Sequence, residues 1–103
     1  FSDAARRELQ EMESVCLAVL DELARETAEP MELLKNVAAL EQRIDDMTGA
    51  YRQNQLDRMR SGACSDEACI IFSELLTDFE RIGDHALNIA EARVSAGAAL
   101  PPA

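Results

Sequence analysis

Hydrophobic residues recur three and four positions apart along most of the chain, which is the spacing of one face of an α-helix. The pattern falls into three segments and predicts helices over about residues 3–28, 30–61 and 65–96, followed by a frayed tail at 97–103. Because short turns join the segments, we predict an all-α fold, an antiparallel up-down-up three-helix bundle forming one domain over residues 1–103. The three apolar stripes consist of Leu9, Met12, Cys16, Val19 and Leu23; Leu33, Val37, Leu40, Ile44, Met47 and Tyr51, with Leu56 and Met59 on a drifted face; and Phe72, Leu75, Phe79, Ile82, Ala86 and Ile89.

Residues that start or stop helices mark the boundaries between these segments. Pro30 breaks the first pattern and suits the first turn of the second helix. Gly62 suits the position just after a helix end, and Ser65 is a good N-cap for the third helix. The boundaries therefore agree with the hydrophobic pattern.

Charge limits the classes of function that remain. The chain has 20 acidic and 10 basic residues, a net charge of -10, so it repels nucleic acid and anionic lipid. With 48% hydrophobic residues it has enough apolar material for a core, which excludes a disordered acidic tail. Its apolar runs are far shorter than the ~20 residues of a membrane-spanning helix. These properties leave a soluble helical domain that attracts cations.

Three cysteines, Cys16, Cys64 and Cys69, are odd in number and lack the C-x-x-C spacing of common zinc sites. We therefore expect small, reduced thiols of a cytoplasmic protein at these positions, not a disulfide framework or zinc ligands.

Two Glu-x-x-x-Asp units are the sharpest chemical feature of the sequence. One unit is Glu41 with Asp45, and the other is Glu80 with Asp84; a spacing of four puts both carboxylates of a unit on one helix face. If the turn is centred near Ala63, Glu41 lies level with Asp84, and Asp45 lies level with Glu80. Four carboxylates at one height repel one another unless a cation neutralises them. The spacing thus raises the hypothesis of a metal site, with iron, manganese, zinc, magnesium and calcium as candidate ions, although such spacing is more typical of a solvated helix face.

The residues also allow other interpretations. The same units occur on ordinary solvated helix faces, where Arg43 and Arg81 would neutralise them as surface ion pairs. A lone histidine, His85, cannot build the paired Glu-x-x-His set of ferritin-like di-iron enzymes, so we expect it to make a hydrogen bond or packing contact, with a ligand role left open. Gly83 beside the carboxylates predicts a close backbone approach or a local need for space. No nucleophile elbow or glycine-rich loop occurs, so we predict no catalytic residues and no organic cofactor.

Residues 72–91 closely resemble the signature helix of PhoU-like domains, with the string ERIGDH at 80–85 and NIAE at 88–91. That family consists of three-helix-bundle repeats implicated in phosphate transport and its signalling. Its Glu/Asp-x-x-x-Asp motifs bind multinuclear metal clusters. The resemblance therefore implies metal ligands at the matching positions, which are Glu41, Asp45, Glu80 and Asp84.

One branch of the family is a finer match. Residues 58–65, running into 71–77, are similar to the cytoplasmic C-terminal PhoU-like domain of bacterial Na/phosphate cotransporter-family proteins. The resemblance implies a place at the inner face of the plasma membrane, as part of a transporter. Since the chain begins at Phe1 and not at Met, we expect it to be cut from a longer membrane protein. That branch has a histidine three residues before Arg58, where this chain has Gln55.

We therefore predict a non-enzymatic regulatory or accessory domain linked to phosphate transport, which binds metal ions. The alternatives are a carboxylate-bridged metalloenzyme and a metal-free helical interaction adaptor. Expected partners are the membrane portion of a transporter or a phosphate-signalling protein, without nucleic acid or direct lipid binding. Standalone PhoU proteins carry two repeats, so we also predict a homodimer. Its contacts would come from apolar residues off the main stripes, namely Leu34, Leu56, Ile70 and Leu76.

Overall fold

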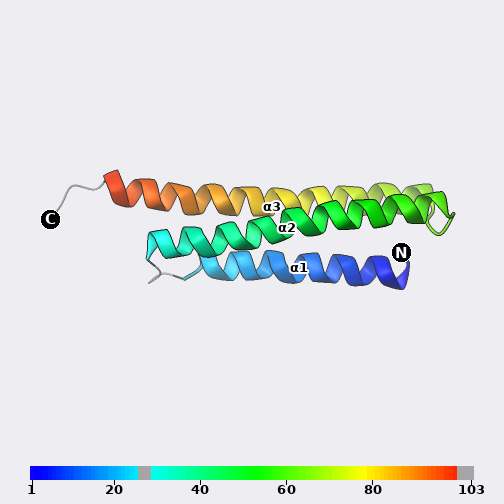
Figure 1. Ribbon diagram of the computed structural model, residues 1–103, viewed down its shortest axis with the longest axis horizontal. Coiled ribbons are helices and arrows are strands. Elements are labelled where there is room, and N and C mark those ends of the chain that lie inside the picture. The colour runs from blue at the N-terminus through cyan, green and yellow to red at the C-terminus, as the bar shows by residue number, and fades with distance from the viewer. Residues whose placement is uncertain (26–28, 100–103) are drawn as a thin grey trace.

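The computed structural model describes residues 1–25 and 29–99. Three α-helices make up most of this range, and it contains no β-strand, so the predicted all-α fold is confirmed. The helices are α1 (Asp3–Leu23), α2 (Pro30–Arg60) and α3 (Asp66–Ala99). They lie side by side along one axis, with the start of α1 at the same end as the turn between α2 and α3 (Figure 1). None of these helices has a stretch long and apolar enough to cross a membrane.

Two helix ends differ from the sequence prediction. Helix α1 ends at Leu23 instead of residue 28, because its hydrophobic stripe stops there and the next residues, Ala24 and Arg25, are exposed. Helix α3 continues to Ala99 through Gly97, since one glycine costs only about 1 kcal/mol in a helix that is already formed. Of the predicted frayed tail, residues 100–103 lie outside the described range, as do residues 26–28 of the predicted first helix.

The predicted boundary residues Pro30, Gly62 and Ser65 lie at the other helix ends, and Glu29 adds a cap that the sequence pattern did not predict. The Glu29 side chain accepts hydrogen bonds from the backbone N–H groups of the first turn of α2, directly before Pro30. After α2, Gly62 takes a left-handed φ of 75°, which a side chain would disfavour. The Ser65 hydroxyl then accepts from the backbone N–H of Ala68 and starts α3. The turn between α2 and α3 is thus defined by local sequence.

The core between the helices contains most of the predicted stripes. On α3, however, Leu76 and Ala90 are fully buried, whereas the predicted core residue Ile89 is 46% exposed. The reason is that α1 and α2 both pack against α3, so its buried face is broader than one stripe. Leu76 is therefore not available as a dimer contact, while Leu56 and Ile70 are exposed. The buried hydrophobic core consists of Ala5, Met12, Val15, Cys16, Val19, Leu33, Val37, Ile44, Phe72, Leu76, Ala86 and Ala90.

A polar network ties α1 to α2 at the end of the bundle that holds the α2–α3 turn. Arg58 donates two hydrogen bonds to the carboxylate of Glu8, at 2.8 and 3.1 Å, and both side chains are largely shielded from solvent. The guanidinium carbon of Arg58 also lies 5.1 Å from the centre of the Phe72 ring, a cation–π contact. Asn54 donates to the same carboxylate, and Tyr51 donates to Glu11. These contacts fix the position of α1 along α2.

Candidate metal centre

Three carboxylate side chains from two helices meet on the surface of the bundle. Glu41 and Asp45 project from α2, one turn apart, and Asp84 projects from α3. One oxygen from each residue lies within 4.8 Å of the other two. Glu41 and Asp45 are half-buried, and Asp84 is exposed. The structure thus brings together three of the four side chains that the sequence proposes as metal ligands.

Gly83 allows this meeting because it lets α3 approach α2 closely. A Cβ atom at Gly83 would lie 3.2 Å from the Cδ1 atom of Ile44 and 3.7 Å from the Cγ atom of Glu41. Ile44 is fully buried, so it has little room to move aside. The absent side chain therefore lets Asp84, the next residue, reach the carboxylate of Glu41. This agrees with the close approach expected from the sequence.

The cluster changes the acidity of Glu41. Its pKa rises from 4.5 to about 7, mainly because burial disfavours the charged carboxylate. The hydrogen bond and negative charge of Asp45 raise this pKa further, followed by the charge and hydrogen bond of Asp84. Near neutral pH, Glu41 therefore holds a proton for part of the time, and a bound cation would replace that proton.

The fourth predicted ligand, Glu80, lies one turn before Asp84 on α3 and is half-buried. It is not in the group of three carboxylates that come within 4.8 Å of one another. An equal height along two helices does not fix direction, because side chains four residues apart differ by about 40° around the helix. Glu80 therefore stays a predicted ligand, whereas the other three have a shared geometry.

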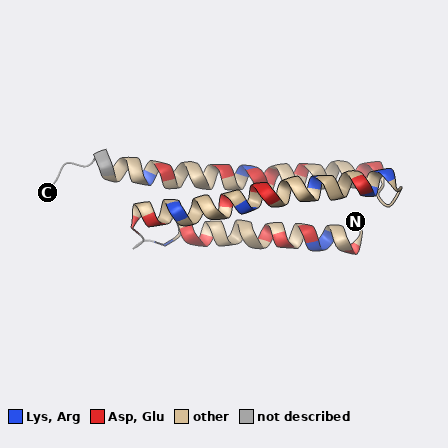
Figure 2. Cartoon of the chain, in the orientation of Figure 1, with Lys and Arg blue, Asp and Glu red and all other residues tan. Residues whose placement is uncertain are grey.

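The predicted surface ion pairs do not form around this cluster. Arg81 lies 3.9 Å from Asp78, on an exposed face of α3, and not against the three carboxylates. Within residues 1–25 and 29–99, neither Arg81 nor Arg43 makes an ion pair with the cluster. Acidic positions occur on all three helices, with basic ones spread among them (Figure 2), so charge alone does not locate a site. In the described part of the chain, no basic side chain therefore forms an ion pair with the three carboxylates.

The available ligand atoms define which ions fit. His85 is exposed and does not belong to the group, so the cluster could offer a metal ion only carboxylate oxygens. Oxygen ligands suit hard cations such as Mg²⁺, Ca²⁺ and Mn²⁺ better than soft ones. Glu74 and Asp78 have the same Glu-x-x-x-Asp spacing on α3, but both are exposed and outside the group. The spacing by itself is therefore insufficient, and the contact with a second helix makes the difference.

The cysteines differ from the expectation of three free thiols. Cys64 and Cys69 are paired as a disulfide across the α2–α3 turn, and Cys16 is free and buried. Burial raises the pKa of Cys16 to about 11. Sequence reasoning missed the pair because a separation of five residues matches no common motif and only the tight turn at Gly62 brings the two together.

Gln55, which replaces the histidine of the resembling branch, is 5% exposed and contacts this pair. Its amide nitrogen lies 2.9 Å from the Sγ atom of Cys64 and 3.3 Å from that of Cys69. Its amide oxygen accepts a hydrogen bond of 2.7 Å from the Nε atom of Arg58. Gln55 therefore links the sulfur pair to the polar network of α1 and α2.

With this geometry established, comparison with known proteins identifies the class of the chain. Residues 9–92 match the PhoU domain family, and the chain belongs to that family. It is 29% identical over 86 residues to a Thermotoga maritima protein named phosphate-specific transport system accessory protein PhoU homolog 1. That alignment covers 82% of this chain and 37% of the relative, so the chain spans just over a third of the relative's length. No solved structure matches the chain.

Proposed function

We propose that this domain is a non-enzymatic accessory or regulatory module of phosphate transport. Membership of the PhoU family supports this role, and so does the name of the Thermotoga maritima relative, an accessory protein of a phosphate-specific transport system. From the finer resemblance to the C-terminal domain of Na/phosphate cotransporters, we also propose that the domain lies at the cytoplasmic face of a transporter. In this proposal the bundle is up-down-up, and its α2–α3 surface, which carries the carboxylate cluster, faces solvent and partner proteins.

We infer that the cluster binds a metal ion, and the observation that carries this inference is the meeting of Glu41, Asp45 and Asp84 from two helices. Half-buried carboxylates that repel one another are unfavourable without a counter-charge, and the raised pKa of Glu41 reflects both the burial and the repulsion. A hard cation would pair with all three oxygens at once. Glu80, one turn before Asp84 on α3, is the proposed fourth ligand.

Metal analysis of protein purified without chelator tests this site. The informative variant is Glu41→Gln with Asp84→Asn, and its matched control is Glu74→Gln with Asp78→Asn, an exposed pair on α3 with the same residue types. We expect stoichiometric metal in the natural protein and the control, and its loss in the site variant. Equal metal content in both variants, or none in the natural protein after exposure to Mn²⁺, Mg²⁺, Ca²⁺, Fe³⁺ and Zn²⁺ in turn, would remove the proposed site.

Two other functions stay as alternatives to be separated by the same samples. A carboxylate-bridged metalloenzyme requires turnover, so metal-loaded protein that hydrolyses phosphate esters or reduces oxygen, with the activity lost in the site variant, would replace the regulatory proposal. If the domain is a metal-free helical adaptor, the natural protein and the site variant would bind the partner equally well. Phosphate uptake is then compared among cells that make the natural protein, the site variant or the control variant. The regulatory proposal requires uptake to change with the site variant and not with the control.

The proposed homodimer is supported by the exposed apolar side chains of Leu56 and Ile70, which are 44% and 60% exposed. A second copy would cover part of this surface, as a second repeat does in two-repeat proteins. Sedimentation equilibrium at tens of micromolar protein tests the dimer, and a monomer under these conditions would overturn it. Leu56→Ser with Ile70→Ser is expected to shift a dimer toward monomer.

A further inference from the structure

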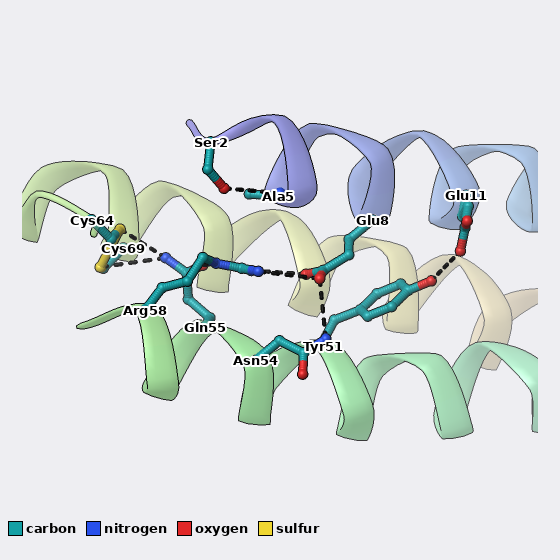
Figure 3. A network of polar contacts seen from close by, with 10 residues as sticks. All are labelled: Ser2, Ala5, Glu8, Glu11, Tyr51, Asn54, Gln55, Arg58, Cys64 and Cys69. Atoms are coloured by element: carbon teal, nitrogen blue, oxygen red, sulfur yellow. Dashed lines mark hydrogen bonds and ion pairs between the residues drawn. A yellow bond between two sulfur atoms is a disulfide. The ribbon is translucent and has the colours of Figure 1, made fainter. Parts of the chain in front are cut away.

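Cys64 and Cys69 lie at the end of the bundle where the α2–α3 turn is next to the start of α1 (Figure 3). Their Cα atoms are 6.3 Å apart, inside the range that a disulfide accepts without backbone movement. Cys64 belongs to the turn, and Cys69 follows one turn after the Ser65 cap, with its backbone N–H bonded to the Ser65 carbonyl. The backbone by itself therefore holds the two cysteines at bonding distance.

Solvent reaches the two sulfur-bearing residues unequally. Cys69 is only 5% exposed, whereas Cys64 is partly exposed in the turn. A small reagent therefore reaches Cys64 first. The Cys69 sulfur is shielded, so it can react only with the Cys64 sulfur, as the attacking or the leaving group. Such an arrangement of one accessible and one shielded sulfur is suited to exchange with a dissolved thiol or disulfide.

Gln55 is placed to influence this exchange. Its amide N–H groups face both sulfurs, at 2.9 and 3.3 Å, and the hydrogen bond from Arg58 to its oxygen fixes that orientation (Figure 3). A donor stabilises a charged thiolate more than a neutral disulfide sulfur, because hydrogen bonds to ions are stronger. Gln55 therefore favours the reduced, thiolate-forming state of the pair.

The disulfide bond itself adds little to the stability of the fold. It closes a loop with a sequence separation of only 5 residues, and short loops give the least stabilisation by a disulfide. The three helices are held by the buried core and by the contact of Arg58 with Glu8, which do not depend on the sulfur–sulfur bond. The pair can thus open and close while the bundle stays folded.

We propose that Cys64 and Cys69 form a thiol–disulfide exchange site for a low-molecular-weight disulfide of the glutathione type, with Gln55 as a positioning residue. In the oxidising direction the Cys64 thiolate attacks one sulfur of the small disulfide, forming a mixed disulfide and releasing one small thiolate. The Cys69 thiolate then attacks the Cys64 Sγ atom, forming the internal disulfide and releasing the second thiolate. The two cysteine thiols lose two electrons and two protons, and the small disulfide becomes two thiols.

The first experiment equilibrates the purified protein with reduced and oxidised glutathione at graded ratios. Acid quenching, alkylation in denaturant and mass spectrometry then count the thiols, with Cys16 as an internal reference. We expect Cys64 and Cys69 to change together in one two-electron transition while Cys16 stays reduced. A pair that stays bonded in excess reduced glutathione, or stays reduced in excess oxidised glutathione, would overturn the proposal.

Single-cysteine variants test the order of attack. Cys69→Ser is expected to accumulate a glutathione adduct on Cys64, whereas Cys64→Ser leaves the shielded Cys69 unmodified in the folded state. Equal modification of both variants would contradict the assigned order. Circular dichroism of each variant before the reaction verifies that the protein is folded.

Gln55→Met, an apolar replacement of similar size, tests the positioning role. We expect the glutathione ratio at half-oxidation to shift about fivefold toward the disulfide, the factor that corresponds to one ordinary hydrogen bond. A variant that changes thermal stability but leaves this ratio unmoved would show that Gln55 serves only packing. The cysteine variants test the exchange site independently of this outcome.

Discussion

Replacing Gly83 by alanine perturbs the contact that brings α3 to the carboxylates of α2. Alanine would stabilise an isolated helix by about 1 kcal/mol relative to glycine. Here the added methyl would lie 3.2 Å from Ile44 Cδ1, closer than ordinary carbon–carbon contact, and Ile44 is fully buried. Extra atoms forced into a packed core cost about 1–3 kcal/mol. The expected net effect of Gly83→Ala ranges from no change to a loss of about 2 kcal/mol.

Gly49→Ala is the matched control, because Gly49 also lies inside a helix but a Cβ added there would meet no atom within 4 Å. This variant should gain the full helix-propensity benefit of about 1 kcal/mol. The two variants are therefore expected to differ by about 1–3 kcal/mol in the free energy of unfolding. For a domain of this size, each 1 kcal/mol corresponds to a shift of about 4–8 °C in Tm.

Urea denaturation of both variants and the natural protein, in chelator at one pH, measures this difference. A second readout is Mn²⁺ titration, since pushing α3 away from α2 separates Asp84 from Glu41 and should weaken cation binding in Gly83→Ala alone. If Gly83→Ala were as stable as Gly49→Ala and bound Mn²⁺ as well, the reasoning from close approach would be refuted.

Three further predictions concern single groups. Arg58→Ala leaves Glu8 without its shielded partner and should lower the free energy of unfolding, measured in urea, by about 3 kcal/mol. Removing the exposed ion pair of Arg25 with Glu22 should lower it by only about 0–1 kcal/mol. Similar losses in the two variants would contradict the importance of the network. Since the pKa of Glu41 is raised from 4.5 to about 7, the folded protein holds a proton that the unfolded chain has lost between these values. Stability of the metal-free protein should therefore fall as pH rises through this window, and Glu41→Gln should flatten that part of the profile measured in chelator. The raised pKa and burial of Cys16 predict negligible alkylation by iodoacetamide at about pH 8 until denaturant unfolds the protein; rapid labelling of native Cys16 would refute this.

Local sequence determined most of the helical structure. The starts of α2 and α3 follow from Pro30 and Ser65, whose effects act within one turn. The sequence pattern places the end of α1 too late, at residue 28. Ala24 and Arg25, which follow Leu23, are exposed, and burial against other helices is a tertiary property. The same holds for α3, where Leu76 is core and Ile89 is surface because two helices pack against it.

For the candidate site, sequence spacing determined which carboxylates share a face of a helix, and only the tertiary structure decided which of them meet. Glu41 and Asp45 are held on one face by their spacing of four, as are Glu80 and Asp84. The rotation of α3 against α2, to which the close contact of Gly83 with Ile44 contributes, brings Asp84 into the group and leaves Glu80 outside it. The sulfur pair shows the same division: the tight turn between Gly62 and Ser65 brings Cys64 near Cys69 locally, whereas the contact of Gln55, from α2, with both sulfurs is a tertiary one. Helix periodicity is a short-range property that a sequence displays directly, whereas helix rotation depends on the sum of many packing contacts between distant residues.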